Sequence, residues 1–308
     1  MDATYEPELY DLVTPASFGG DLEWYRRRAK DSAGPVLELG AGTGRLALRL
    51  AADGTHVHAL ESNAAMLGAL RRKITGSPDE VRRRIVPVEA DMRSFQVDRT
   101  FALVIAPFRA ILHNLTEDDQ LACFQQVRGH LRPGGRFLFN VFHPSLEYMA
   151  RNAGALTGVW RWAGTYPRPD GSWVVRSEAN QYDTVPRRVH SLHRYEDYGP
   201  DGVLRRTVLH SLELAYLYAA DIERLLTRAG FDSVDIRGIR WPTLRARHGR
   251  ARGRRRRRAL VAPRVSVGAV ASTDVQAIRV GRLHRGPHAR GGAVGMRWSA
   301  TFGTSPGP

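Results

Sequence analysis

The sequence of 308 residues has a single cysteine, Cys123, and no uninterrupted apolar run long enough for a membrane helix. One cysteine cannot build an internal disulfide framework, and it suits a reducing compartment. A spanning helix needs roughly 18 or more consecutive apolar residues, and residues 1–10 are too acidic and polar for a secretory signal. We therefore expect a cytoplasmic protein with no membrane partner, in which Cys123 is a small core residue.

Acidic residues are almost absent from the C-terminal part of the chain. Residues 239–308 contain 16 arginines, no lysine and one acid, Asp274. In residues 1–238 the basic and acidic side chains number 30 each. The formal net charge of +15 therefore belongs to the C-terminal segment, and the charge of the remainder is balanced.

Two interpretations of residues 239–308 stay open. A basic arm rich in Arg, Gly, Ala and Pro is typical of disordered segments that bind nucleic acid or anionic surfaces. The abrupt change of composition also fits a C-terminus altered by a reading-frame change in a GC-rich gene, which we favour. Because the segment has no helical or strand periodicity, we predict that it is disordered or frame-altered, and we expect no nucleic-acid partner.

Residues 35–238 alternate apolar runs with amphipathic segments. The apolar runs predict five strands, at 35–39, 55–60, 85–88, 101–105 and 136–141. The amphipathic segments predict helices at 46–52, 63–74 and 116–131. This alternation is typical of a parallel sheet covered by helices.

The pattern changes after His143. Long strands are predicted at 173–182, 187–195 and 203–218, which is typical of an antiparallel meander. A helix at 220–229 and a strand at 233–237 follow. We predict an α/β protein with a Rossmann-like, doubly wound, mainly parallel sheet and an antiparallel β insertion. Its parts are a helical lid (1–34), the main domain (35–238, with the insertion at about 155–218) and the tail (239–308).

A glycine-rich turn follows the first strand. The sequence of residues 36–44 is VLELGAGTG, and an acid, Glu61, stands 17 residues beyond Gly44 at the end of the second strand. Glycines let the backbone approach a bulky ligand, and an acid at that spacing accepts hydrogen bonds from both ribose hydroxyls. The pattern predicts a ligand that contains a nucleoside.

Two residues distinguish between cofactors. A dinucleotide-binding loop, G-x-G-x-x-G, requires glycine at position 45, where Arg45 stands. Glu38, two residues before the first glycine, would repel a pyrophosphate but suits a ligand with an ammonium and a sulfonium group. These residues favour S-adenosylmethionine over a dinucleotide.

With these features, residues 30–238 resemble the class I methyltransferases. The resemblance implies that S-adenosylmethionine is the cofactor and that the glycine loop lies against it. It also implies that Glu61 binds the ribose, that Asp91 and Met92 hold the adenine, and that the end of the fourth strand opens towards donor and acceptor. The cofactor-binding residues predicted in this way are Glu38, Gly40, Ala41, Gly42, Gly44, Glu61, Asp91, Met92 and Pro107.

Two residues are candidates for a catalytic role. Residues 5–11 resemble the lid segment of small-molecule members, in which Tyr10 would bond to the cofactor carboxylate or line the acceptor pocket. His113 follows the fourth strand and titrates near neutral pH. Packing of an N-terminal helix, for Tyr10, and a structural role, for His113, stay open as alternatives.

Aromatic residues gather in the predicted insertion, namely Trp160, Trp162, Tyr166, Trp173, Tyr182 and Tyr195. The insertion resembles the one that amine methyltransferases use to cover substrate and to form a homodimer. Residues 106–109 read Ala-Pro-Phe-Arg, which differs from the acceptor motif of nucleic-acid amino methyltransferases. We predict SN2 methyl transfer to a nitrogen, or an oxygen, of a small molecule. A nucleic-acid-binding protein that uses the basic tail and a non-catalytic S-adenosylmethionine binder are the alternatives.

Two further expectations concern histidines and the last strand. His190 and His193 point to opposite faces of one strand, so we expect no metal site. Class I members end with a strand antiparallel to the sheet, and residues 264–270 are the late apolar stretch that could supply it. Without that strand the sheet edge would be exposed, and we would expect poor solubility or domain pairing.

Overall fold

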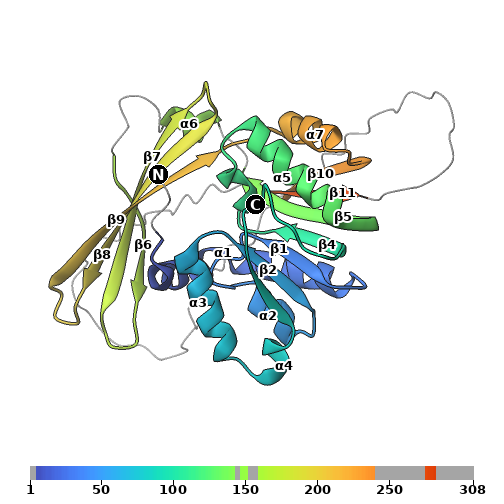
Figure 1. The fold of residues 1–308 in the computed structure, drawn as a ribbon. Helices are drawn as coiled ribbons and strands as arrows, with labels where there is room; N and C mark the ends of the chain where they lie inside the picture. Colours follow the sequence, from blue (N-terminus) through green and yellow to red (C-terminus); the bar gives the residue numbers. More distant parts are fainter. Residues whose placement is uncertain (1–4, 143–145, 152–158, 240–274, 282–308) are drawn as a thin grey trace, which may run out of the picture.

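The computed structural model describes residues 5–142, 146–151, 159–239 and 275–281. It contains a sheet of seven strands and a sheet of four strands (Figure 1). No helix in these ranges is both long and apolar enough to span a membrane. The mainly parallel sheet with a separate antiparallel sheet confirms the predicted fold class.

The seven-stranded sheet has the order β10-β11-β5-β4-β1-β2-β3. Its strands are β1 (Val36–Leu39), β2 (Val57–Glu61), β3 (Ile85–Glu89), β4 (Phe101–Ala106), β5 (Leu131–Phe142), β10 (Ser233–Ile239) and β11 (Val275–Gly281). The first five pair in parallel, and β11 is antiparallel to both β5 and β10. β3 lies at the edge, as its proline predicts.

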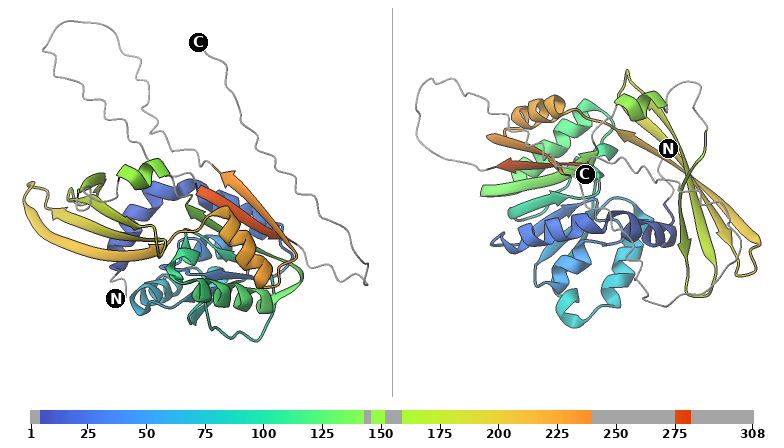
Figure 2. Two further views of the ribbon diagram at one scale, coloured as in Figure 1. Left: turned by 90° about the horizontal axis from the view of Figure 1, so that it is seen from above. Right: turned by 180° about the vertical axis from the view of Figure 1, so that it is seen from behind.

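Helices cover both faces of this sheet (Figures 1 and 2). On one face lie α5 (Glu117–His130) and α7 (Ala219–Arg228), with Leu37 and Leu39 of β1 in their core. On the other face lie α1 (Pro7–Lys30), α2 (Ala47–Ala52) and α3 (Ala64–Thr75), with Val36 in their core. Because successive side chains of β1 point to opposite faces, all four of its residues are buried, Glu38 included. Two short helices, α4 (Asp79–Arg82) and α6 (Leu146–Arg151), and a 3₁₀ turn, η1 (Ala110–His113), complete the set.

Helix starts follow the capping residues of the sequence. The Asn63 side chain accepts a hydrogen bond from the Met66 amide and caps α3. Thr116 and Asp119 form a reciprocal capping box at the start of α5. Cys123 is buried on α5, as expected. These local signals place α3 and α5 within one or two residues of the predicted bounds.

The four-stranded sheet is a meander of β6 (Arg161–Pro167), β7 (Trp173–Asp183), β8 (Arg188–Tyr198) and β9 (Leu204–Ala215). Its inner face packs on α1, where Leu9 and Val13 contact a cluster that includes Tyr166 and Tyr195. β9 also contacts η1, which follows β4. The meander therefore lies beside the carboxyl ends of the parallel strands, and α1 packs against both sheets (Figure 2).

Some aromatic residues of the meander are buried and others are exposed. Tyr166 and Tyr195 are buried against α1, whereas Trp162 is 64% exposed. Trp173 stacks on Tyr198 at 5.6 Å between ring centroids. Because successive side chains of a strand point to opposite faces, aromatics that are close in sequence are divided between the two faces.

The last strand of the parallel sheet corrects the prediction for the tail. β11 is formed by residues 275–281 and not by the predicted residues 264–270, which lie outside the described residues. It lies between β5 and β10. The main sheet thus extends past residue 238 into the range predicted as disordered or frame-altered. Pairing through backbone groups needs no side-chain periodicity, so composition gave no signal for this strand. The remaining tail residues also lie outside the described ranges.

Because β11 pairs with strands on both sides, its removal should expose two sheet edges. We predict that a chain ending at residue 262 unfolds at a lower temperature or aggregates, whereas a chain ending at residue 284 behaves as the full-length protein. Thermal unfolding and size-exclusion chromatography of the two truncations measure this. Equal stability of both truncations would contradict the pairing of β11.

Candidate active site

The glycine loop after β1 turns in conformations that only glycine adopts freely. Gly40, Gly42 and Gly44 have φ angles of 64°, 57° and 87°, in the left-handed region. A Cβ atom at Gly40 would lie 2.8 Å from the Cβ of Ala110, and one at Gly44 would overlap Leu70. The turn therefore requires glycine both for its backbone angles and for its close packing.

The carboxylate of Glu61 fixes this loop to the end of β2. Its Oε2 atom accepts a hydrogen bond from the Gly42 amide at 2.8 Å, and its Oε1 atom accepts one from the Asn63 amide at 2.8 Å. Glu61 is 9% exposed. Each carboxylate oxygen can accept a second hydrogen bond, so this group can hold the loop and still accept from a diol.

Glu38 is a buried acid beneath the same loop. It is 1% exposed, and its Oε2 atom has no hydrogen-bond partner among the described residues. Burial raises the pKa of Glu38 to about 8, although the nearby charge of Arg45 acts in the opposite direction. A buried, unpartnered carboxyl group is costly, and an approaching cation would stabilise its charged form.

Arg45 does not neutralise Glu38, because it is engaged by α1. Its guanidinium donates two hydrogen bonds to Asp21, at 2.8 Å and 2.6 Å, and both side chains are nearly buried. Asp11 of α1 accepts from the Thr43 hydroxyl at 2.5 Å and pairs with Lys73 at 2.6 Å. Sequence reasoning missed the contacts of Asp21 and Asp11 with this part of the chain. The charged residue at position 45, directly after the glycine loop, was the available signal for the first of them.

An aromatic wall stands over the loop. The ring centroids of Tyr5 and Tyr10 lie 6.2 Å apart, as do those of Tyr10 and Phe108. Tyr5 also lies 6.4 Å from His113, centroid to centroid. The Tyr10 hydroxyl would be 3.9 Å from a Cβ atom at Gly42. The structure thus brings both predicted catalytic residues to one wall, and it adds Tyr5 and Phe108.

Burial governs the protonation of this wall. It raises the pKa of Tyr10 to about 12 and lowers the pKa of His113 to about 4. The His113 side chain is nevertheless accessible to solvent, as a ring that lines a concave surface can be. His113 is therefore a neutral imidazole near neutral pH that can accept a hydrogen bond, and the expectation that it titrates near neutral pH is wrong because desolvation disfavours its charged form.

The residues predicted to hold an adenine are only partly gathered at the loop. Met92 lies beneath it, with its Cε 3.8 Å from a Cβ atom placed at Gly40, and its sulfur accepts a hydrogen bond from Asn114. Asp91 forms a two-pronged ion pair with Arg93, which holds the pKa of Asp91 below its usual range. Pro107 is buried directly after β4.

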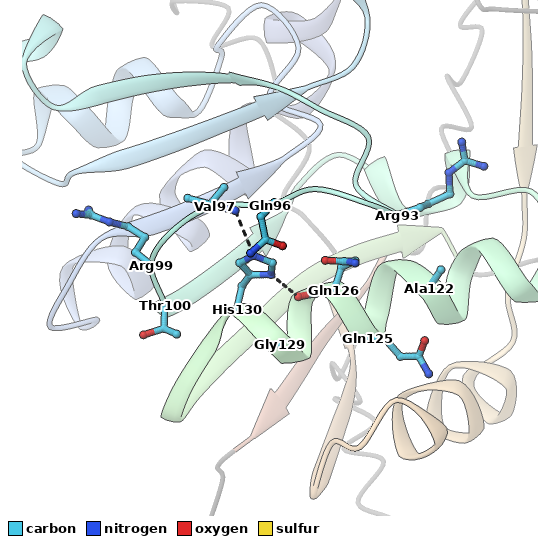
Figure 3. Close-up of a pocket in the computed structure, with 10 residues that line it drawn as sticks. All are labelled: Arg93, Gln96, Val97, Arg99, Thr100, Ala122, Gln125, Gln126, Gly129 and His130. Atoms are coloured by element: carbon cyan, nitrogen blue, oxygen red, sulfur yellow. Dashed lines mark hydrogen bonds between the residues drawn. The ribbon is translucent and has the colours of Figure 1, made fainter.

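Figure 3 shows a hollow between the segment 93–100 and α5, with His130 near its centre. The His130 ring contacts the Val97 amide and the Gln126 carbonyl. None of the predicted site residues lines this hollow. In the described part of the chain, no group of three or more His, Cys, Asp or Glu side chains is arranged to hold a metal ion.

Comparison with known proteins identifies the domain. Residues 36–135 match the family described as Methyltransferase domain. The chain thus contains a segment, residues 36–135, that matches a methyltransferase domain. S-adenosylmethionine is the cofactor of such domains, and the buried acids Glu38 and Glu61 beside a left-handed glycine loop fit its cationic groups and its ribose.

Two curated relatives, both from Streptomyces, resemble this domain. The chain is 27% identical over 140 residues to a cypemycin N-terminal methyltransferase from Streptomyces sp., which covers 45% of this chain and 55% of that protein. It is 31% identical over 134 residues to dTDP-3-amino-3,6-dideoxy-alpha-D-glucopyranose N,N-dimethyltransferase of Streptomyces fradiae, which covers 42% and 49%. The chain thus matches about half the length of these relatives.

A solved structure resembles more of the chain. The CcbJ methyltransferase from Streptomyces caelestis superposes with a TM-score of 0.61 and 26% identity, over 86% of this chain and 90% of that chain. This likeness includes more than the residues matched by the family, and it agrees with the two-sheet architecture described above.

The raised pKa of Glu38 predicts a dependence of stability on pH in the ligand-free protein. Between the ordinary glutamate pKa and about 8, the folded state keeps a proton that the unfolded state has lost, so stability falls as pH rises. Relative to Glu38→Gln, the wild type should lose roughly 1.4 kcal/mol per pH unit between about pH 5 and pH 8. Urea unfolding at three pH values measures this.

Glu80→Gln, an exposed change in α4, serves as the matched control and should follow the wild type at every pH. A pH-independent difference between Glu38→Gln and the wild type would mean that Glu38 carries an ordinary pKa.

Proposed function

We propose that this protein is an S-adenosylmethionine-dependent methyltransferase that acts on a nitrogen of a small-molecule acceptor, such as an amino sugar or a peptide amine. The observation that carries the proposal is the Glu61 carboxylate, which binds the Gly42 amide at the turn that also buries Glu38. An acid pair at this position suits a ligand with cationic groups and a ribose.

The cofactor-binding residues follow from this arrangement. Glu61 would accept from the ribose hydroxyls with the acceptor capacity that its two backbone bonds leave. The backbone of Gly40, Ala41, Gly42 and Gly44 would lie along the ligand, and Glu38 would face its cationic part. Asp91, Met92 and Pro107 would complete the adenine side, with Arg93 orienting the Asp91 carboxylate.

The charge balance around the loop supports a cationic ligand. Lys73 is paired with Asp11 and Arg45 with Asp21. Glu38 and Glu61 form no ion pair within the described residues. A pyrophosphate would meet two acids here, whereas an ammonium or sulfonium group would be stabilised by them.

The acceptor side is the wall of Tyr10, Phe108 and His113. Bound S-adenosylmethionine supplies an electrophilic methyl group. An amine held in line with that methyl group would form the new N–C bond with its lone pair as the C–S bond breaks, leaving S-adenosylhomocysteine, and the methylated ammonium would then release a proton to solvent. Orientation can supply most of the rate, and the neutral His113 ring can accept a hydrogen bond that orients the amine.

The relatives favour nitrogen over oxygen as the acceptor atom. One is named an N-terminal methyltransferase and one an N,N-dimethyltransferase of an amino sugar nucleotide. A nucleic-acid role of the basic tail is not favoured, since neither name refers to nucleic acid.

We propose two further properties, a cytoplasmic location and a homodimer. The single, unpaired Cys123 suits the reducing cytoplasm. The outer face of the four-stranded sheet exposes Trp162, Leu192 and Leu209, which suits pairing with a second copy. Both stay predictions.

If Glu61 holds both the loop and the ribose, Glu61→Gln should lower affinity for S-adenosylmethionine about 10- to 100-fold, because charge-assisted hydrogen bonds are lost. Isothermal titration calorimetry measures the Kd. Glu89→Gln, at the exposed end of the neighbouring strand β3, is the matched control and should bind as the wild type does. Unchanged affinity in Glu61→Gln would exclude the ribose role.

The activity is tested by incubating the full-length protein with methyl-labelled S-adenosylmethionine and a panel of acceptors. The panel comprises amino sugar nucleotides, peptides with free N-termini, and phenols. We expect label in an amine, and at least tenfold less in the Glu61→Gln variant. Transfer to phenols alone would replace nitrogen by oxygen as the acceptor. Tight cofactor binding with no labelled product would indicate a non-catalytic binder.

A further inference from the structure

The segment that follows β4 turns in a conformation that its residues disfavour. Phe108 and Arg109 have φ angles of 54° and 67°, in the left-handed region where side chains other than glycine meet steric hindrance. Two consecutive residues of this kind persist only where the surroundings hold the backbone. Because the turn leads directly into η1, its conformation sets where Phe108 and His113 point.

One side-chain oxygen holds this turn. Oδ1 of Asn140 accepts a hydrogen bond from the Phe108 amide at 2.9 Å and a second one from the Tyr25 hydroxyl at 2.8 Å. Asn140 is 4% exposed and Tyr25 is 1% exposed. Loss of this oxygen would leave the buried Tyr25 hydroxyl and the part-buried Phe108 amide without this acceptor.

Asn140 is the polar exception in the apolar run formed by residues 137–142 of β5. Its neighbours Phe139 and Val141 lie in the core on the α5 side of the sheet. Leu138, two positions before it, lies in the α1-side core together with Tyr25. Because strand side chains alternate, Asn140 points to the α1 side as well. An aliphatic residue would bury more apolar surface there, so the contribution of this amide lies in its hydrogen bonds.

The register places Asn140 level with the turn. Ala106, the last residue of β4, pairs with Phe139 of β5, so Asn140 lies one position beyond the last paired residue. Its second donor, Tyr25, belongs to α1, the helix that carries Tyr10. One oxygen therefore joins the helix that carries Tyr10 to the turn that carries Phe108.

We infer that Asn140 is a positioning residue for the acceptor side of the site, which it serves by holding the left-handed turn at Phe108 and joining that turn to α1. The inference rests on the proposed function, in which Tyr10, Phe108 and His113 form the acceptor wall. The two hydrogen bonds that Asn140 Oδ1 accepts come from Tyr25 and Phe108, and neither joins it to Glu38, Glu61 or the glycine loop. Its loss should therefore affect the acceptor and spare the cofactor.

Three variants isolate the role. Asn140→Leu removes the shared acceptor, and Asn140→Asp keeps an oxygen at the same place. The double variant Tyr25→Phe/Asn140→Leu removes the Tyr25 hydroxyl as well, so that only the Phe108 amide is left without its partner. This variant protects the test against general misfolding, since it replaces the buried polar pair by apolar groups of similar shape.

The first readout uses S-adenosylhomocysteine and needs no acceptor. We expect its Kd, from calorimetry, to stay within twofold of the wild type in all three variants. Hydrogen exchange of the complexes, followed by mass spectrometry, should be at least tenfold faster in peptides covering residues 107–113 of Asn140→Leu and of the double variant. Asn140→Asp should exchange at the wild-type rate.

The second readout uses the amine that the acceptor panel identifies. Asn140→Leu should raise the KM for this amine at least tenfold and leave the KM for S-adenosylmethionine within twofold, and Asn140→Asp should restore the amine KM. A purely structural role would change both KM values together.

Unchanged exchange over residues 107–113 in both leucine variants would overturn the inference. An equal loss of S-adenosylhomocysteine binding in Asn140→Leu and the double variant would also overturn it, because Asn140 would then support the whole fold. If the panel yields no acceptor, the proposed function fails, while the exchange readout still decides the role of Asn140.

Discussion

The site depends on one hydrogen bond, from the Gly42 amide to the Glu61 carboxylate. It closes a turn with left-handed backbone angles against the end of the neighbouring strand, and the same carboxylate fixes the start of the next segment through Asn63. A buried acid is stable here because backbone donors satisfy it. Glu38 is buried beside the same turn, but its Oε2 atom has no hydrogen-bond donor among the described residues. One acid therefore fixes the loop, and the other is the residue that we propose faces the cationic part of the cofactor.

The remaining parts of the molecule are arranged around this loop. α1 is fixed to it by Asp21, which pairs with Arg45, and by Asp11, which accepts from Thr43. The same helix packs under the four-stranded sheet and donates through Tyr25 to Asn140. The wall that faces the loop is consequently supported from three sides: α1, β5 and the meander. The methyl donor and its acceptor would meet between parts that are held by buried polar contacts.

Sequence patterns predicted the features that arise locally. The loop glycines, the acid at the end of β2 and the Asn63 cap each follow from neighbouring residues, and the structure contains them. The contacts between Arg45 and Asp21 and between Tyr25 and Asn140 join residues 24 and 115 positions apart. No local pattern encodes such pairings, although a lone Asn in an apolar strand was a visible signal for the second.

The final strand illustrates a different limit. β11 pairs through its backbone with β5 and β10, and backbone pairing leaves little trace in residue type. The arginine-rich composition around it directed the prediction towards disorder, and the expected strand was placed at 264–270. The fold needs a strand that joins β10 to β5. The expected strand order was therefore a better guide to the presence of β11 than the composition of residues 239–308.

A crystal structure of the complex with S-adenosylhomocysteine tests the central claim most directly. The account predicts that the ribose hydroxyls donate to the Glu61 carboxylate, that the amino acid part lies along residues 40–44 near Glu38, and that the sulfur faces the wall of Tyr10, Phe108 and His113. A ligand bound away from residues 38–44, or a ribose without contact to Glu61, would contradict the account.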